Sequence, residues 1–208
     1  MYVMTLDQRG SSRSEDIVPS TLQQLNAWGK RDGVVLKFER TAGDEVQGTL
    51  DSPQAVVDVV TAAVRTDVWR IGIGVGDVEL PLPRSTRAAR GSAYVAARAA
   101  IEAARTSPQH LSVVGAPGYG DLDMLSFNRA IRNAESALWL LTSLLRRRTR
   151  DGWQVVDLAD TGVTQREVAE QLGVSASAVS QRLRRAGHLE EQRGRALASA
   201  LLHLAEVS

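Results

Sequence analysis

Residues 162–187 read GVTQREVAEQLGVSASAVSQRLRRAG, and this stretch decides the fold of the C-terminal part of the chain. Thr164 and Glu167 have the spacing of a capping box that opens a helix. Gly173 can adopt the left-handed conformation that ends such a helix, and Ser175 can cap the helix that follows. The stretch therefore predicts two short helices joined by a tight turn.

The side chains of these two helices divide into an apolar face and a polar face. Val168, Leu172, Val179 and Leu183 point inward, and Ala169 is small where the helices cross. The outward side chains carry hydroxyl, amide and guanidinium groups, which suit base edges and phosphates. The pattern is that of a helix-turn-helix, with double-stranded DNA as the expected partner. The candidate DNA-binding residues are Gln165, Arg166, Ser175, Ser177, Ser180, Gln181, Arg182, Arg184 and Arg185.

Two further helical patterns flank this pair. Residues 153–162 supply a helix before it and residues 189–207 supply one after it. The four helices resemble the DNA-binding domain of sigma factor region 4 and of LuxR-type regulators. The alternative is a helical hairpin that contacts protein, with the arginines as a solvated face. The run RRRTR at 146–150 either binds phosphate or complements the negative end of a helix dipole, and both interpretations stay open.

The first part of the chain alternates predicted strands and helices. The order β-α-β-β-α-β-α-β is that of an α+β sandwich with a ferredoxin-like core. Strand patterns cover residues 1–6, 33–40, 46–50, 68–80 and 110–116, and helical patterns cover residues 17–28, 52–64 and 92–105.

A single long helical pattern, residues 122–148, follows this part. Such a helix links domains or joins a dimer interface. Its leucines exceed what one small domain leaves uncovered, so we expect a homodimer with this helix as an interface. The leucines are Leu138, Leu141, Leu144 and Leu145.

The hairpin RTAGDEV at 40–46 resembles that of GGDEF-type diguanylate cyclases and of class III nucleotide cyclases. Both families need an aspartate at the end of the first strand, because two carboxylates must hold Mg²⁺ against the substrate phosphates. Asp7 occupies that place and Asp44 is the hairpin aspartate. The resemblance implies Asp7 and Asp44 as metal ligands, and Arg40 and Arg98 as residues that bind a nucleotide.

Two departures from the cyclase pattern argue against turnover. Tyr94 or Ala93 stands where class III enzymes have an asparagine, and Arg87 stands where they have a base-reading aspartate. Loss of the asparagine donor removes charge stabilisation from the transition state. We therefore expect no catalytic residue and, if the domain meets a nucleotide with Mg²⁺ at all, binding rather than conversion. The alternative is that Asp7 and Asp44 only terminate a strand and a hairpin.

Together the two halves resemble the SatD family, small bacterial proteins with a cyclase-like region followed by a helix-turn-helix. The resemblance implies a cyclase-like α+β domain at 1–122, a connecting or dimerisation helix at 123–150, and a DNA-binding domain at 151–208. It implies a transcriptional regulator whose degenerate cyclase-like domain serves dimerisation, nucleotide sensing or both. The alternatives are a Mg²⁺-dependent nucleotide cyclase with a helix-turn-helix appendage and a protein–protein adaptor.

Composition limits the kinds of protein that this chain can be. The 208 residues include no cysteine, which excludes disulfides and thiolate metal sites. No apolar run approaches the ~20 residues of a membrane span, and no signal-peptide pattern opens the chain, so we expect a cytoplasmic protein. The formal net charge is +1, and from Arg146 onward 10 arginines stand against 8 acidic residues. This small surplus is weak evidence for nucleic acid by itself.

Overall fold

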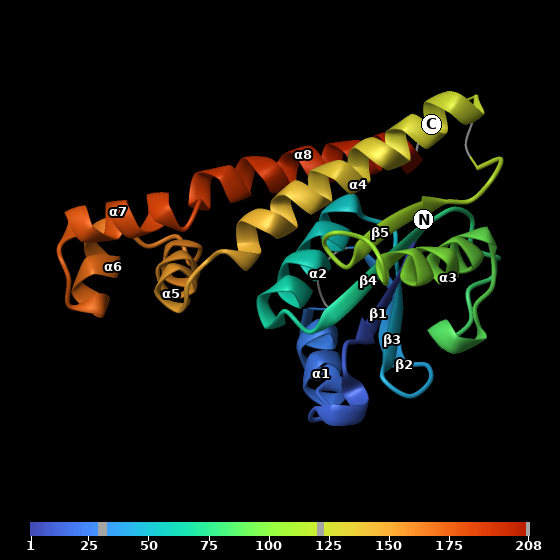
Figure 1. Cartoon of the computed structure of the whole chain (residues 1–208), viewed down its shortest axis with the longest axis horizontal. Coiled ribbons are helices and arrows are strands. Elements are labelled where there is room, and N and C mark those ends of the chain that lie inside the picture. Colours follow the sequence, from blue (N-terminus) through green and yellow to red (C-terminus); the bar gives the residue numbers. More distant parts are fainter. Residues whose placement is uncertain (29–32, 120–122, 207–208) are drawn as a thin grey trace.

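The computed structural model describes residues 1–28, 33–119 and 123–206. Within them the chain is a mixed α/β structure with a five-stranded mixed sheet and eight α-helices (Figure 1). The strands are β1 (Tyr2–Gln8), β2 (Val34–Arg40), β3 (Glu45–Leu50), β4 (Trp69–Val75) and β5 (Leu111–Gly115). The first helices are α1 (Val18–Trp28), α2 (Pro53–Thr66), α3 (Ser92–Ala104) and α4 (Met124–Arg146). The last are α5 (Arg150–Ala159), α6 (Gln165–Leu172), α7 (Ala176–Arg185) and α8 (His188–Glu206).

The predicted order of strands and helices is confirmed through β5 and into the helical part. Two 3₁₀ helices, η1 (Ser11–Arg13) and η2 (Thr86–Ala88), lie in segments for which neither a strand nor a helix is predicted. Residues 122 and 207, the outer ends of two predicted helices, lie outside the described residues. The sequence periodicity was therefore sufficient to place the elements, though not their ends.

The strands lie in the order β2-β3-β1-β4-β5. β1 is antiparallel to both of its neighbours, β3 and β4, whereas β5 is parallel to β4. Asp7 in β1 stands opposite Glu45 of β3 and Arg70 of β4. The end of the first strand is therefore beside the β2–β3 hairpin.

Side chains alternate along β1 between the two faces of the sheet. Tyr2, Met4 and Leu6 belong to the main core, which also includes side chains of α1, α2, α4 and α8. Val3 packs on the other face against Ala93 and Ala97 of α3. The sheet is thus covered on both faces, and α3 covers one of them (Figure 1).

Strand β4 contains glycines at alternate positions because α3 lies unusually close to it. A Cβ added to Gly74 would lie well inside contact distance of the Ala93 carbonyl oxygen and the Ala97 backbone nitrogen. A strand was predicted over residues 68–80, but β4 ends at Val75. Beyond it, the Asp77 carbonyl accepts from the Ala93 N–H at 3.0 Å, so the backbone there bonds to the start of α3 instead of to the sheet.

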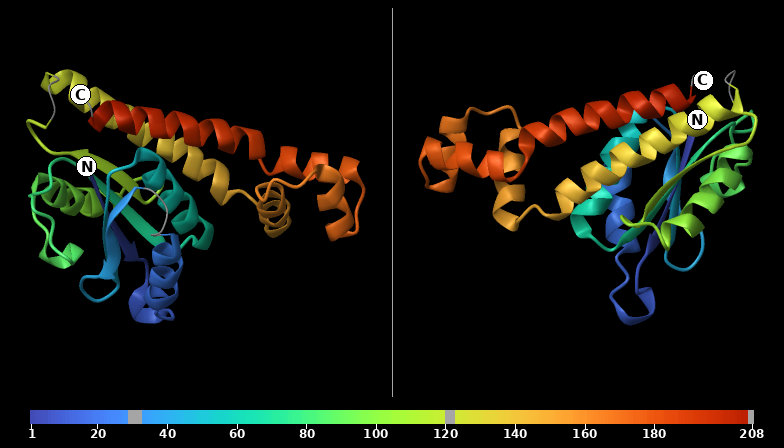
Figure 2. Two further views of the ribbon diagram at one scale, coloured as in Figure 1. Left: turned by 180° about the vertical axis from the view of Figure 1, so that it is seen from behind. Right: turned by 45° about the horizontal axis from the view of Figure 1, so that its top comes forward.

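Helix α8 runs beside α4 and covers it (Figures 1 and 2). Leu138, Leu141 and Leu145 are 0%, 3% and 1% exposed and belong to the main core, and Leu144 is half-buried. The inference that these leucines remain uncovered is therefore wrong, because residues far along the chain fold back over them. Dimerisation stays a prediction, without these leucines as its interface.

Helices α5, α6 and α7, the three-helix unit, have a core of their own at one end of the molecule (Figure 2). That core includes Val155, Val156, Val168, Val179 and Leu183. The division of the chain into three domains remains a prediction, since α8 packs on α4 and α2. Among the described residues, none of the helices has the length and apolar character needed to cross a bilayer.

Candidate nucleic-acid interface

Local sequence determines how α6 and α7 meet. The Thr164 hydroxyl accepts from the Glu167 N–H at 3.3 Å, and the Glu167 carboxylate accepts from the Thr164 N–H at 2.7 Å. Gly173 ends α6 with a φ of 63°, and the Ser175 hydroxyl caps α7 by accepting from the Ala178 N–H at 3.2 Å. The predicted capping box, turn glycine and second cap are confirmed.

The polar residues predicted from this stretch lie mostly on the surface. Gln165, Arg166, Ser175, Ser177, Gln181, Arg184 and Arg185 are exposed, whereas Ser180 and Arg182 are half-buried. Val179 and Leu183, from the opposite side of α7, are 0% and 8% exposed. Helix α7 therefore has one face in the core and one face open to a partner.

Few of these candidate side chains have a hydrogen-bond or ion-pair partner among the described residues. Arg166 pairs with Glu170 at 3.3 Å along α6, and Ser175 serves as the cap of α7. Hydrogen bonds from the Thr164 N–H and hydroxyl hold the pKa of the Glu167 carboxyl below its ordinary value, which favours the carboxylate form that completes the capping box. Within the described part of the chain, the side chains of Gln181, Arg182, Arg184 and Arg185 have no hydrogen-bond or ion-pair partner.

The three-helix unit meets the rest of the chain at a joint of charged side chains around Trp153. The Arg148 side chain is 0% exposed, and one of its terminal nitrogens lies 2.7 Å from Glu191 Oε2. Arg65 makes two hydrogen bonds to Asp157, at 2.7 and 2.6 Å, and these raise the pKa of its guanidinium. The guanidinium carbons of Arg65 and Arg148 lie 4.8 and 4.5 Å from the centroid of the Trp153 ring.

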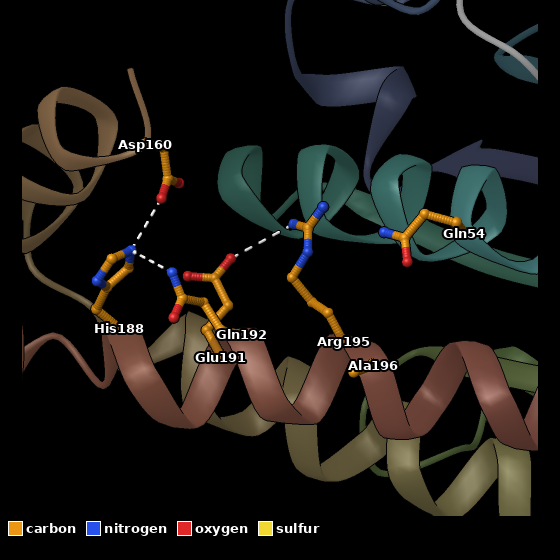
Figure 3. Close-up of a pocket in the computed structure, with 7 residues that line it drawn as sticks. All are labelled: Gln54, Asp160, His188, Glu191, Gln192, Arg195 and Ala196. Atoms are coloured by element: carbon orange, nitrogen blue, oxygen red, sulfur yellow. Dashed lines mark hydrogen bonds and ion pairs between the residues drawn. The ribbon is translucent and has the colours of Figure 1, made fainter. Parts of the chain in front are cut away.

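Figure 3 shows the side of the joint where α8 faces α5 and α2. His188 Nε2 lies 2.8 Å from Asp160 Oδ1, and Glu191 Oε1 lies 3.5 Å from Arg195, which also pairs with Asp58. A cleft of about 370 Å³ lies among these residues. Each charged side chain drawn there has a partner within the chain, so the cleft belongs to the joint.

The two aspartates proposed as metal ligands lie at neighbouring strand ends. A terminal nitrogen of Arg70 donates to Asp7 Oδ2 at 2.7 Å, so the Asp7 carboxylate is paired with a guanidinium. The Asp44 backbone carbonyl accepts from the Gln8 N–H at 3.3 Å, which places the hairpin beside β1. Across the described residues, no three His, Cys, Asp or Glu side chains are grouped as a metal site. Arg70 therefore occupies one of the two carboxylate oxygens of Asp7.

The two arginines proposed to bind a nucleotide line different hollows. Arg40 pairs with Asp16 at 2.8 Å and lines a hollow of about 290 Å³ together with Asp44. Arg98 lines another, of about 360 Å³, together with Tyr94. The structure therefore does not bring Arg40 and Arg98 into one hollow.

The sequence did not predict the joint. The run RRRTR drew attention to basic residues, but nothing in it distinguishes Arg148, which is buried, from Arg147, which is exposed. An acidic residue at position 191 of a long helix is also unremarkable on its own. The pairing depends on how α8 returns along α4, which local patterns do not encode.

Comparison with known families gives one match. A family model described as SatD family (SatD) matches residues 6–202, a range that runs from the end of β1 through the other strands, α4 and the three-helix unit to most of α8. No curated protein and no solved structure matches the chain.

Proposed function

The chain belongs to the SatD family, and we propose that it is a DNA-binding transcriptional regulator. In this proposal α6 and α7 form a helix-turn-helix, and α7 enters the major groove of duplex DNA. One observation carries the proposal: α7 buries Val179 and Leu183, while its amide and three guanidinium groups have no partner among the described residues. Such groups read base edges and hold phosphates.

The angular order of residues around α7 suggests a role for each. Successive residues are separated by about 100°, so with Val179 and Leu183 facing the core, Gln181 lies at the centre of the outward face. Arg184 lies on one flank of Gln181 and Arg185 on the other. In this proposal Gln181 reads a base and the two arginines contact the two backbones.

For the N-terminal part we propose a ferredoxin-like, nucleotide cyclase-like fold that serves dimerisation, nucleotide sensing or both. The order β2-β3-β1-β4, with β1 antiparallel to both neighbours, supports this proposal. Pairing two copies would present two α7 helices to half-sites about one helical turn apart. Mg²⁺-dependent cyclase activity would additionally require Asp7 to coordinate a cation while its Oδ2 is paired with Arg70.

Replacing Gln181 by alanine should reduce discrimination between a preferred duplex and a random one. Loss of a bidentate contact to a base costs about 1–3 kcal/mol of discrimination, or about fivefold to more than a hundredfold. Arg184→Ala should instead weaken binding to both duplexes by similar factors, because a phosphate contact carries no sequence information. Competition mobility-shift assays with the full chain measure both ratios.

Gln154→Ala is the matched control, since Gln154 is an exposed glutamine of α5 outside the proposed contact face. It should leave both affinities unchanged. If Gln181→Ala discriminates between the preferred and the random duplex as well as the unchanged chain does, α7 does not read the base through this residue.

A further inference from the structure

A hollow of about 380 Å³ lies where the end of α4, the first turn of α5 and helix α7 meet. It is large enough for a phosphodiester group and open to solvent at the edge of the proposed DNA-binding face. The residues that line it include Arg147, Thr149, Asp151, Gly152, Arg182 and Arg185.

The hollow has a surplus of positive charge. Arg147, Arg182 and Arg185 are not in ion pairs anywhere in the described part of the chain, whereas Asp151 is the single carboxylate among the described residues that line the hollow. Other arginines of this chain are paired: Arg148, for example, is held by Glu191. Three unneutralised guanidinium groups around one space favour an anion there.

The first three arginines of the run RRRTR have different surroundings. Arg146 lies 2.9 Å from Asp67, and burial holds the pKa of its guanidinium below the ordinary value. Arg148 is buried in the joint. Arg147, between them, is exposed and lines the hollow, with one bond from its Nε to the Ser143 carbonyl of its own helix. Its terminal nitrogens are available to a ligand.

The first turn of α5 adds to the positive field. Thr149 caps this ten-residue helix, and its hydroxyl accepts from the Gly152 N–H at 3.2 Å. The first N–H groups of a helix carry a partial positive charge, and anions are favoured beside them. The Asp151 carboxylate in the same turn opposes that field, so its removal should strengthen anion binding where removal of an arginine weakens it.

We propose that this hollow holds a backbone phosphate of the duplex that α7 reads, with Arg147, Arg182 and Arg185 as its cationic residues. The inference rests on the proposed function and extends the contact surface beyond α6 and α7 to the end of α4. Arg182 and Arg185 lie one turn apart on one flank of α7, and Arg184 lies on the other flank. The three-helix unit therefore contacts phosphates on both sides of the groove.

Arg147→Ala should weaken binding to a pool of random duplexes of about 20 base pairs, enough for two half-sites. The slope of log affinity against log salt is negative, and loss of one phosphate contact reduces its magnitude by about 0.9. This corresponds to about eightfold weaker binding at about 0.1 M salt. Fluorescence anisotropy with the full chain, from about 50 to 200 mM salt, gives both values. Arg129→Ala is the matched control: it removes the same charge from the same exposed face of α4, five turns earlier and about 27 Å away.

Asp151→Asn should act in the opposite direction and tighten binding several-fold, since it removes the carboxylate that opposes the phosphate. Equal affinities and slopes for Arg147→Ala and Arg129→Ala, together with an unchanged affinity for Asp151→Asn, would overturn the inference. In that case salt-dependent binding that is weakened by Arg184→Ala would leave the proposed function standing. Absence of binding by the unchanged chain would instead remove the proposed function itself.

Discussion

Replacing Arg148 by alanine is expected to lower the free energy of unfolding by about 3–5 kcal/mol. The side chain is fully buried, its Nε donates to the Ala186 carbonyl at 2.9 Å, and its terminal nitrogen lies 2.7 Å from Glu191. The Glu191 side chain is only 6% exposed, so alanine at 148 would leave a buried carboxylate facing a cavity. Arg195, at 3.5 Å, would be its only remaining cationic neighbour among the described ion pairs.

The effect should be large because Arg148 links two cores. The main core belongs to the sheet with α4 and α8, and the second core belongs to the three-helix unit. Arg148 donates a hydrogen bond to Ala186 at the end of α7, forms an ion pair with Glu191 in α8, and contacts the Trp153 ring of α5. Its loss should therefore loosen the three-helix unit from the sheet as well as reduce overall stability.

Urea denaturation followed by circular dichroism measures this effect. The double variant Arg148→Met with Glu191→Leu should recover most of the loss, because apolar side chains of similar volume replace a buried ion pair at little cost. Arg150→Ala, which removes an exposed arginine two residues away, should change stability by less than about 0.5 kcal/mol. A loss for Arg148→Ala as small as that for Arg150→Ala would contradict the account of the joint.

Replacing Gly74 by alanine is expected to lower the free energy of unfolding by about 3 kcal/mol or to prevent folding. The added Cβ would meet the backbone of α3 at Ala93 and Ala97, and backbone atoms within a helix cannot rotate away as a side chain can. Helix α3 would have to move off the sheet, which would open the small core that Ala93 and Ala97 form with Val3. Thermal unfolding followed by circular dichroism measures the loss.

Replacing Gly194 by alanine should instead raise the free energy of unfolding. Gly194 lies within α8, and its added Cβ would lie 3.4 Å from Leu141 Cδ1, an ordinary packing distance. Alanine in the interior of a helix is more stable than glycine by about 1 kcal/mol. Equal stabilities for Gly74→Ala and the unchanged chain would mean that α3 does not approach β4 as closely as described.

Patterns local in the sequence predicted the elements well. The caps of α6 and α7 depend on residues three positions apart, so Thr164, Gly173 and Ser175 could be assigned their roles from sequence alone. The end of β4 was predicted too late because residues 76–80 alternate like a strand. Instead, the Glu79 N–H donates to the Arg90 carbonyl and the Asp77 carbonyl accepts from the Ala93 N–H at the start of α3, contacts between residues 11 and 16 positions apart.

Features that depend on the return of α8 could not be predicted. Leu138 and Leu141 appear uncovered when only the long helical pattern is considered, yet α8 buries them. Arg148 meets Glu191 through the same return of the chain. In the N-terminal part, resemblance to cyclases placed Asp7 at the correct strand end, but its partner Arg70 comes from a strand that the hairpin motif does not include.

The central claim is that α7 reads bases in duplex DNA, and selection from a random pool tests it most directly. The full chain is mixed with random-sequence duplexes, the bound fraction is recovered over several rounds, and the recovered duplexes are sequenced. We expect a recurring motif for the unchanged chain, with half-sites about one helical turn apart if it binds as a dimer, and loss of preference at one position with Gln181→Ala. Recovery of duplexes without any shared motif, or of an identical motif with Gln181→Ala, would contradict the account.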